Sequence, residues 1–120
     1  MKLSEAQHLF AQLLPSLLTY ANDMAEENGW LVTIGDVFRD PRVHGEYGQK
    51  VGYASAKSNH KLKLAIDINI IDKEKGQLLG PEAHQKLGKF WKELHELCEW
   101  GGDPGRNDAN HYSLHFWGRW

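Results

Sequence analysis

The sequence has little cysteine, no long apolar run and almost no net charge. Cys98 is the only cysteine, so no disulfide can form within the chain and a cysteine-rich zinc module is excluded. Any metal site must therefore use histidine and carboxylate ligands, and the chain has seven histidines. The formal net charge of -2 provides no general attraction to nucleic acid or to an anionic membrane, so we expect neither as a partner.

No stretch approaches the roughly 20 apolar residues that a membrane-spanning helix needs. The N-terminal segment also lacks the apolar core of a signal peptide, because Glu5, Gln7 and His8 interrupt it. We therefore expect a soluble product that is cytoplasmic as synthesised, without membrane insertion. The 120 residues, 41% of them hydrophobic, suit a single domain over residues 1–120, for which a monomer is the simplest expectation.

Hydrophobic periodicity predicts two helices. Ser4 and Gln7 have the spacing of a capping box, a helical apolar stripe follows them, and Gly29 is the predicted end of the helix. Pro15 lies inside this stripe and predicts a kink or a second helix start. Pro81 suits the first turn of the second helix. The apolar face of that helix comprises Leu87, Phe90, Trp91, Leu94, Leu97 and Cys98.

Strands are predicted at residues 30–38, 64–71 and 111–117, with long loops at 42–59 and 100–110. The clearest strand is 64–71, in which apolar side chains alternate with a second set on the opposite face. Together these elements predict an α+β fold, a small antiparallel sheet with helices packed on one side. The remaining face of the sheet would stay open for a site.

Asp67 places a carboxylate in the middle of the apolar strand 64–71, where an unpaired buried charge is costly. His60 lies seven residues earlier, and a turn at residues 61–63 would let the two side chains converge. Imidazole and carboxylate are both suitable zinc ligands. Taken alone, however, this spacing favours a hydrogen bond between His60 and Asp67, or a pairing of Asp67 with a lysine.

A second cluster, Asp108 to His111, offers a further histidine and a carboxylate three residues before it. A catalytic zinc needs three protein ligands and an open position, beside which a free carboxylate can take a proton from water. Alone, the cluster also fits a turn residue and a surface histidine. His115 competes with His111 as a ligand, but Tyr112, three residues before His115, cannot serve as a carboxylate base.

Together, the clusters resemble the motifs of the M15 metallopeptidases, the family of D-Ala-D-Ala carboxypeptidases and dipeptidases and of phage L-alanyl-D-glutamate endolysins. Ser58 to Asp67 resembles the motif S-x-H-x-x-G-x-A-x-D, although Lys63 replaces its glycine and suggests a different turn. Asp108 to His111 resembles the second motif, an acidic residue three before a zinc histidine. The Trp-Gly-Gly-Asp run at 100–103 is similar to that of short phage-type members, and the resemblance covers nearly the whole chain.

This resemblance implies a Hedgehog/DD-peptidase-like fold and a zinc metallopeptidase. Asp108 would be the catalytic acid/base, and Arg39 would bind substrate or stabilise developing charge as a second catalytic residue. Ser58 would contact substrate. The Zn²⁺ ligands implied are His60, Asp67 and His111.

The implied substrate is the peptidoglycan stem peptide, and a short chain is most similar to an L-alanyl-D-glutamate endopeptidase, an endolysin that degrades the cell wall. Such an enzyme would reach the wall only after release by another factor. Two alternatives stay open: a D-Ala-D-Ala carboxypeptidase or dipeptidase, and a non-catalytic zinc-binding domain of the same fold. Outside this set, His84 and His95 are expected on helices, solvent-facing or partly buried.

Overall fold

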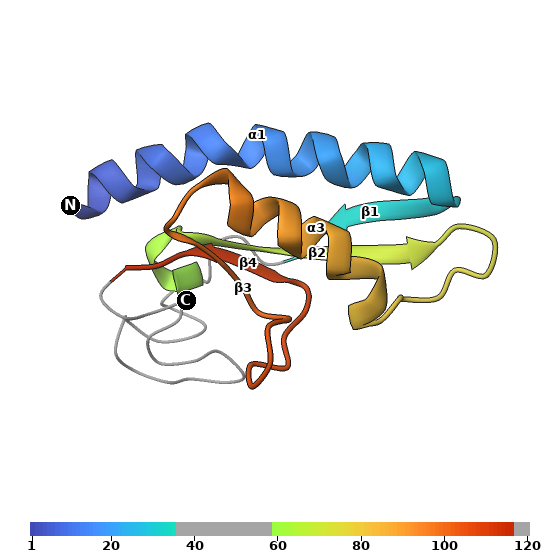
Figure 1. Cartoon of the computed structure of the whole chain (residues 1–120). Coiled ribbons are helices and arrows are strands. Elements are labelled where there is room, and N and C mark those ends of the chain that lie inside the picture. The colour runs from blue at the N-terminus through green and yellow to red at the C-terminus, as the bar shows by residue number, and fades with distance from the viewer. Residues whose placement is uncertain (36–58, 117–120) are drawn as a thin grey trace.

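The computed structural model describes residues 1–35 and 59–116. Its elements form an α+β fold, with two helices packed on one face of a four-stranded antiparallel sheet (Figure 1). The helices are α1 (Leu3–Asn28) and α3 (Pro81–Leu94), and a short 3₁₀ helix, η1 (Asn59–Leu62), precedes the second strand. The strands, in spatial order, are β1 (Trp30–Ile34), β2 (Ala65–Asp72), β4 (His111–Leu114) and β3 (Cys98–Trp100). Within these described ranges, no helix is long and apolar enough to cross a membrane.

The predicted capping box at the start of α1 is wrong. The helix begins before Ser4, and the Lys2 backbone N–H donates to the Glu5 carboxylate over 2.8 Å. The Gln7 side chain instead donates to the carbonyl of Leu62, also over 2.8 Å. The Gln7 side chain, which the local pattern assigned to a helix cap, therefore makes a tertiary contact instead. This contact connects the end of η1 to α1.

Pro15 does not break α1, which continues through it as one helix (Figure 1). The missing backbone hydrogen bond is offset because residues before and after the proline share one buried stripe. The buried residues of this stripe are Ala6, Phe10, Leu17, Ala21, Met24 and Ala25. The stop at Gly29 is confirmed: its φ is 70°, in the left-handed region that favours glycine, and its N–H donates to the Ala25 carbonyl.

The alternation predicted for the central strand is confirmed in β2. Ile66, Ile68 and Ile70 are buried beneath the helices, while Asp67 and Asn69 lie on the opposite face. β2 pairs antiparallel with β1 on one side and with β4 on the other. The strand predicted at 30–38 ends at Ile34 within the described residues, and its last three positions lie outside them.

The second helix is shorter than its apolar pattern predicts. α3 ends at Leu94, and Cys98 begins β3 instead of continuing the helix. Cys98 lies opposite Leu114 and Trp100 lies opposite Tyr112, so both extend the sheet core beside β4. A strand of three residues is too short to show its own periodicity, which is why the sequence pattern merges it with the helix. β4 ends at Leu114, before the end of the strand predicted at 111–117, whose last residue lies outside the described residues.

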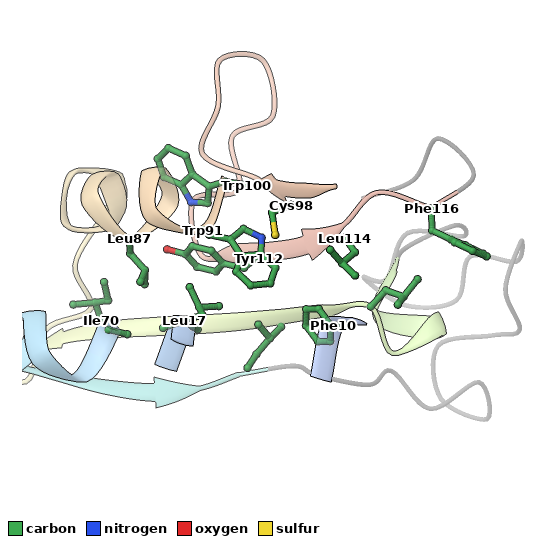
Figure 2. Packing of buried hydrophobic residues seen from close by; sticks show 14 of the residues in the cluster. Phe10, Leu17, Ile70, Leu87, Trp91, Cys98, Trp100, Tyr112, Leu114 and Phe116 are labelled. Carbon is green, nitrogen blue, oxygen red and sulfur yellow. The ribbon is translucent and has the colours of Figure 1, made fainter. Parts of the chain in front are cut away.

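Trp91 packs α3 against strands β3 and β4 (Figure 2). Its side chain is fully buried, and its Nε1–H lies 3.1 Å from the carbonyls of both Glu99 in β3 and Ser113 in β4. The ring of Phe10 from α1 meets it edge-to-face at 6.0 Å. One side chain therefore connects both helices to the strand that carries His111.

His84 corrects another expectation, because it is buried in the core side of α3 and only 2% exposed. Its Nδ1 lies 2.6 Å from the hydroxyl oxygen of Tyr112 in β4. Burial lowers the pKa of His84 to about 4, because the charged imidazole would lose its hydration. The folded protein therefore holds a neutral histidine at this position.

This neutral histidine should make stability depend on pH. Between about pH 6.5 and 4 the unfolded chain binds a proton at His84 that the folded chain does not, so stability falls as the pH falls. From pH 7.5 to 5 the loss should be about 2 kcal/mol. The free energy of unfolding is measured in urea with the metal-free protein. His84→Gln should not show this pH-dependent loss of stability, whereas the exposed control His8→Gln should show it. Equal losses in the two variants would contradict the prediction.

Candidate metal centre

Three potential ligands meet on the sheet face opposite the helices. Asp67 in β2 and His111 in β4 are direct partners in the antiparallel register, so their side chains emerge side by side. His60 comes from η1, which turns back just before β2 begins. These three form a buried or partly buried group whose ligand atoms all lie within 4.8 Å of one another. The three ligands predicted from the sequence are thus brought together.

The spacing of the three ligand atoms suits a metal ion. His60 Nε2 lies 3.0 Å from Asp67 Oδ1 and 3.1 Å from His111 Nδ1, and the last two atoms are 3.5 Å apart. A single imidazole nitrogen has either one hydrogen or one lone pair, which serves one partner well and not two. Ligands of a tetrahedral zinc with bonds of about 2.0–2.1 Å lie roughly 3.3 Å apart. The three atoms could therefore hold one shared cation.

The electrostatics of Asp67 favour a cation at the same point. Burial by itself raises the pKa of this carboxyl, but the hydrogen bonds to His111 and His60 outweigh it and hold the pKa far below its usual value. Asp67 therefore stays ionised in a site where water is scarce. Two imidazoles and one carboxylate form a donor set that suits a divalent cation such as zinc.

Lys63 shapes the turn that brings His60 back toward Asp67. Its φ is 59°, in the left-handed region where a side chain is disfavoured and glycine is not. Its N–H faces the His60 carbonyl at 3.3 Å, closing η1 immediately before β2. The backbone at this position is therefore one that the glycine of the M15 motif would adopt without strain.

Asp108 lies beside the triangle without forming part of it. Its Oδ2 is 3.9 Å from His111 Nδ1, and its side chain is 48% exposed. The loop around it is fixed by backbone hydrogen bonds, since Asp108 N–H donates to the Gly101 carbonyl and His111 N–H donates to that of Asp108. This carboxylate can therefore reach both solvent and a molecule held at the ligands.

Trp100 packs against the loop that carries Asp108, a contact that was not predicted from the sequence. A Cβ added to Gly88 or to Gly102 would lie 2.2 or 2.1 Å from the indole, so the ring is sandwiched between two glycines. Its Nε1–H donates to the carbonyl of Ala109 over 2.6 Å. The Trp-Gly-Gly run was the available signal, but the partner glycine in α3 is distant in the sequence.

The other predicted site residues fall elsewhere. Arg39 and Ser58 lie outside the described residues. His115 is half-exposed and its Nδ1 lies 2.8 Å from Glu99 Oε1, away from the three-residue group. Comparisons with protein-family models and with curated proteins gave no match.

Substitution of each candidate histidine in turn distinguishes His111 from His115 as the third ligand. Removing His111 opens the triangle, so His111→Ala should weaken zinc binding by on the order of 100-fold or more. The control His115→Ala removes a nearby histidine outside the triangle and should leave affinity and the stoichiometry of one zinc unchanged. Isothermal titration calorimetry on the metal-free protein measures both. If His115→Ala were the more damaging change, the ligand set described here would be wrong.

A second prediction concerns the turn at Lys63. Glycine relieves the positive φ, although it loses more backbone entropy on folding, so Lys63→Gly should keep stability within about 1 kcal/mol or raise it. Lys63→Val should cost about 1–3 kcal/mol, because a β-branched side chain is poorly tolerated there. Chemical unfolding of the two variants gives the comparison. Equal stability of the glycine and valine variants would show that the turn has another conformation.

Proposed function

We propose that this chain is a zinc-dependent peptidase of the M15 type that hydrolyses peptidoglycan stem peptides. Its foremost candidate activity is that of a phage-type L-alanyl-D-glutamate endopeptidase, on a Hedgehog/DD-peptidase-like fold. The observation that carries the proposal is the convergence of His60, Asp67 and His111 with Asp108 at 3.9 Å from the last ligand. The motif resemblance pairs the same four residues as three ligands and one acid/base.

The reaction would divide its work between the ligands and Asp108. A divalent cation held by His60, Asp67 and His111 would supply Lewis acidity toward the scissile carbonyl and toward the attacking water. Asp67 and His111 on the sheet and His60 on η1 would hold the ion, and so would fix where the scissile bond must lie. Asp108 accepts the proton of the attacking water at its carboxylate and then donates it to the departing nitrogen. Its partial exposure lets it serve both steps.

Arg39 and Ser58 complete the proposed machinery from the segment that is not described. In this proposal, the Arg39 guanidinium stabilises negative charge on the substrate or on the oxygen that develops charge during attack. Ser58, which precedes His60 by two residues in the sequence, would contact the substrate. The enzyme would act on the cell wall after another factor releases it from the cytoplasm.

Asp108→Asn tests the proposal because it removes the base while preserving the size of the side chain. It should retain zinc affinity within about twofold and lose roughly 10²- to 10⁴-fold of the hydrolysis rate. Asp103→Asn is a matched control: Asp103 lies in the same loop, but its carboxylate pairs with Lys92 at 2.6 Å, away from the ligands. Mass spectrometry of digested, purified peptidoglycan measures the rate and identifies the products.

The products decide between the three hypotheses. Fragments cut between L-Ala and D-Glu support the endopeptidase, and free D-Ala would instead assign a carboxypeptidase or dipeptidase. Wild-type protein that binds one zinc and cleaves no stem peptide would overturn the enzymatic proposal in favour of a zinc-binding domain. Full activity of Asp108→Asn would leave the metal site intact but remove this residue from the mechanism.

A further inference from the structure

A second feature lies next to the ligand triangle, a cavity of about 200 Å³ between the start of α3, the end of β2 and the loop before His111. Asp108 lines this cavity and also lies 3.9 Å from His111 Nδ1, so the two sites share a wall. Asn69 lies on the same face of β2 as Asp67, two residues along, and also lines the cavity. A substrate side chain bound in the cavity would therefore lie next to a peptide bond positioned at His60, Asp67 and His111.

The polar residues that line this cavity are Asn69 and Asn110, with Asn107, Asp108 and the buried His84 beside them. Asn69 Oδ1 and Asn110 Nδ2 are 3.4 Å apart, a long contact that leaves donors and acceptors of both groups available to a ligand. Asn110 is also held in place by its backbone, because its carbonyl accepts the Ile68 N–H over 2.9 Å. A carboxamide pair offers both a donor and an acceptor, the complement of a peptide N–H and C=O.

The other walls of the cavity are partly apolar, and its volume is small. Leu79, Pro81 and Ala109 contribute to its walls, and the buried His84 closes it from α3. Pockets for drug-sized ligands have roughly 300–1,000 Å³, so this cavity suits a fragment such as one short amino-acid residue. Among its lining residues, all in the described part of the chain, Asp108 alone carries a formal charge, which would repel a carboxylate.

We propose that this cavity, which we name the Asn69–Asn110 pocket, binds one short, uncharged residue of the substrate together with an adjoining peptide amide. The inference rests on the proposed peptidase function, since it assigns the pocket to one side of the scissile bond. Asn69 and Asn110 are then specificity-determining residues that select residue size and charge at that position. They do not touch the reacting atoms.

Small probes test the pocket without requiring hydrolysis. The zinc-loaded full chain is titrated with racemic N-acetylalaninamide, N-acetylleucinamide and N-acetylalanine, followed by ¹H–¹⁵N NMR including the asparagine side-chain amides. N-acetylalaninamide should shift the Asn69 and Asn110 signals and bind at least about fivefold more tightly than the bulkier or the anionic probe. Asn69→Ala should weaken its binding about five- to tenfold, the loss of roughly one hydrogen bond, with zinc affinity unchanged.

Thr33→Ala is the matched control, because Thr33 pairs with Asn69 across β1 and β2 but does not line the pocket. It should bind the probe as the wild type does. If Asn69→Ala fails to fold, Asn110→Ala tests the same claim with the same expected loss. Equal binding of all three probes, or unchanged binding in the asparagine variants, would overturn the pocket assignment.

The two proposals can fail separately. Probe binding at Asn69 and Asn110 in a protein that cleaves no peptidoglycan would refute the peptidase and keep the pocket. Hydrolysis that persists with unaltered KM and unaltered residue preference in Asn69→Ala would keep the peptidase and refute the pocket. A selective rise in KM for the short-residue substrate, with kcat little changed, is the result that supports both.

Discussion

The antiparallel register between β2 and β4 is the constraint on which the candidate site depends. It sets Asp67 opposite His111 and, one residue away, Ile66 opposite Tyr112, so one pairing orders the ligands on one face and the core on the other. Side chains alternate with a period of two, and a slip of one residue would send the carboxylate under the helices. The buried isoleucines make that slip very costly. Hydrophobic burial thus fixes the position of the polar site.

Tryptophan side chains on the core side reinforce the same strand pairing. Trp91 Nε1–H lies 3.1 Å from the Ser113 carbonyl in β4, and Trp100 donates to Ala109 just before that strand begins. Both indoles contact backbone groups within two residues of His111. Packing on the helix-covered face of the sheet therefore positions a candidate ligand on the opposite face. This arrangement places the ligands on rigid elements, where a small displacement would alter metal geometry. Stability of the core and geometry of the site are therefore not independent.

Sequence patterns predicted the features that depend on local chemistry. The alternation in β2 and the left-handed stop at Gly29 follow from side-chain period and backbone sterics, and both are confirmed. The sequence could not reveal that Gln7 contacts η1, or that Cys98 joins a strand, because both depend on neighbours distant in the chain. The motif also brought forward the three ligands, whereas Asn69 was not singled out because its importance comes only from a cavity formed by separate segments.

The different burial of the ligands and of Asp108 matches the different tasks proposed for them. His60 and His111 are almost fully buried, which restricts their rotamers and keeps competing water away from the ligand atoms. Asp108 is half-exposed on a loop, a position that suits the proposed transfer of a proton between water and a leaving nitrogen. The proposed catalytic role of Asp108 rests on this contrast between two buried histidines and an exposed carboxylate 3.9 Å from His111 Nδ1.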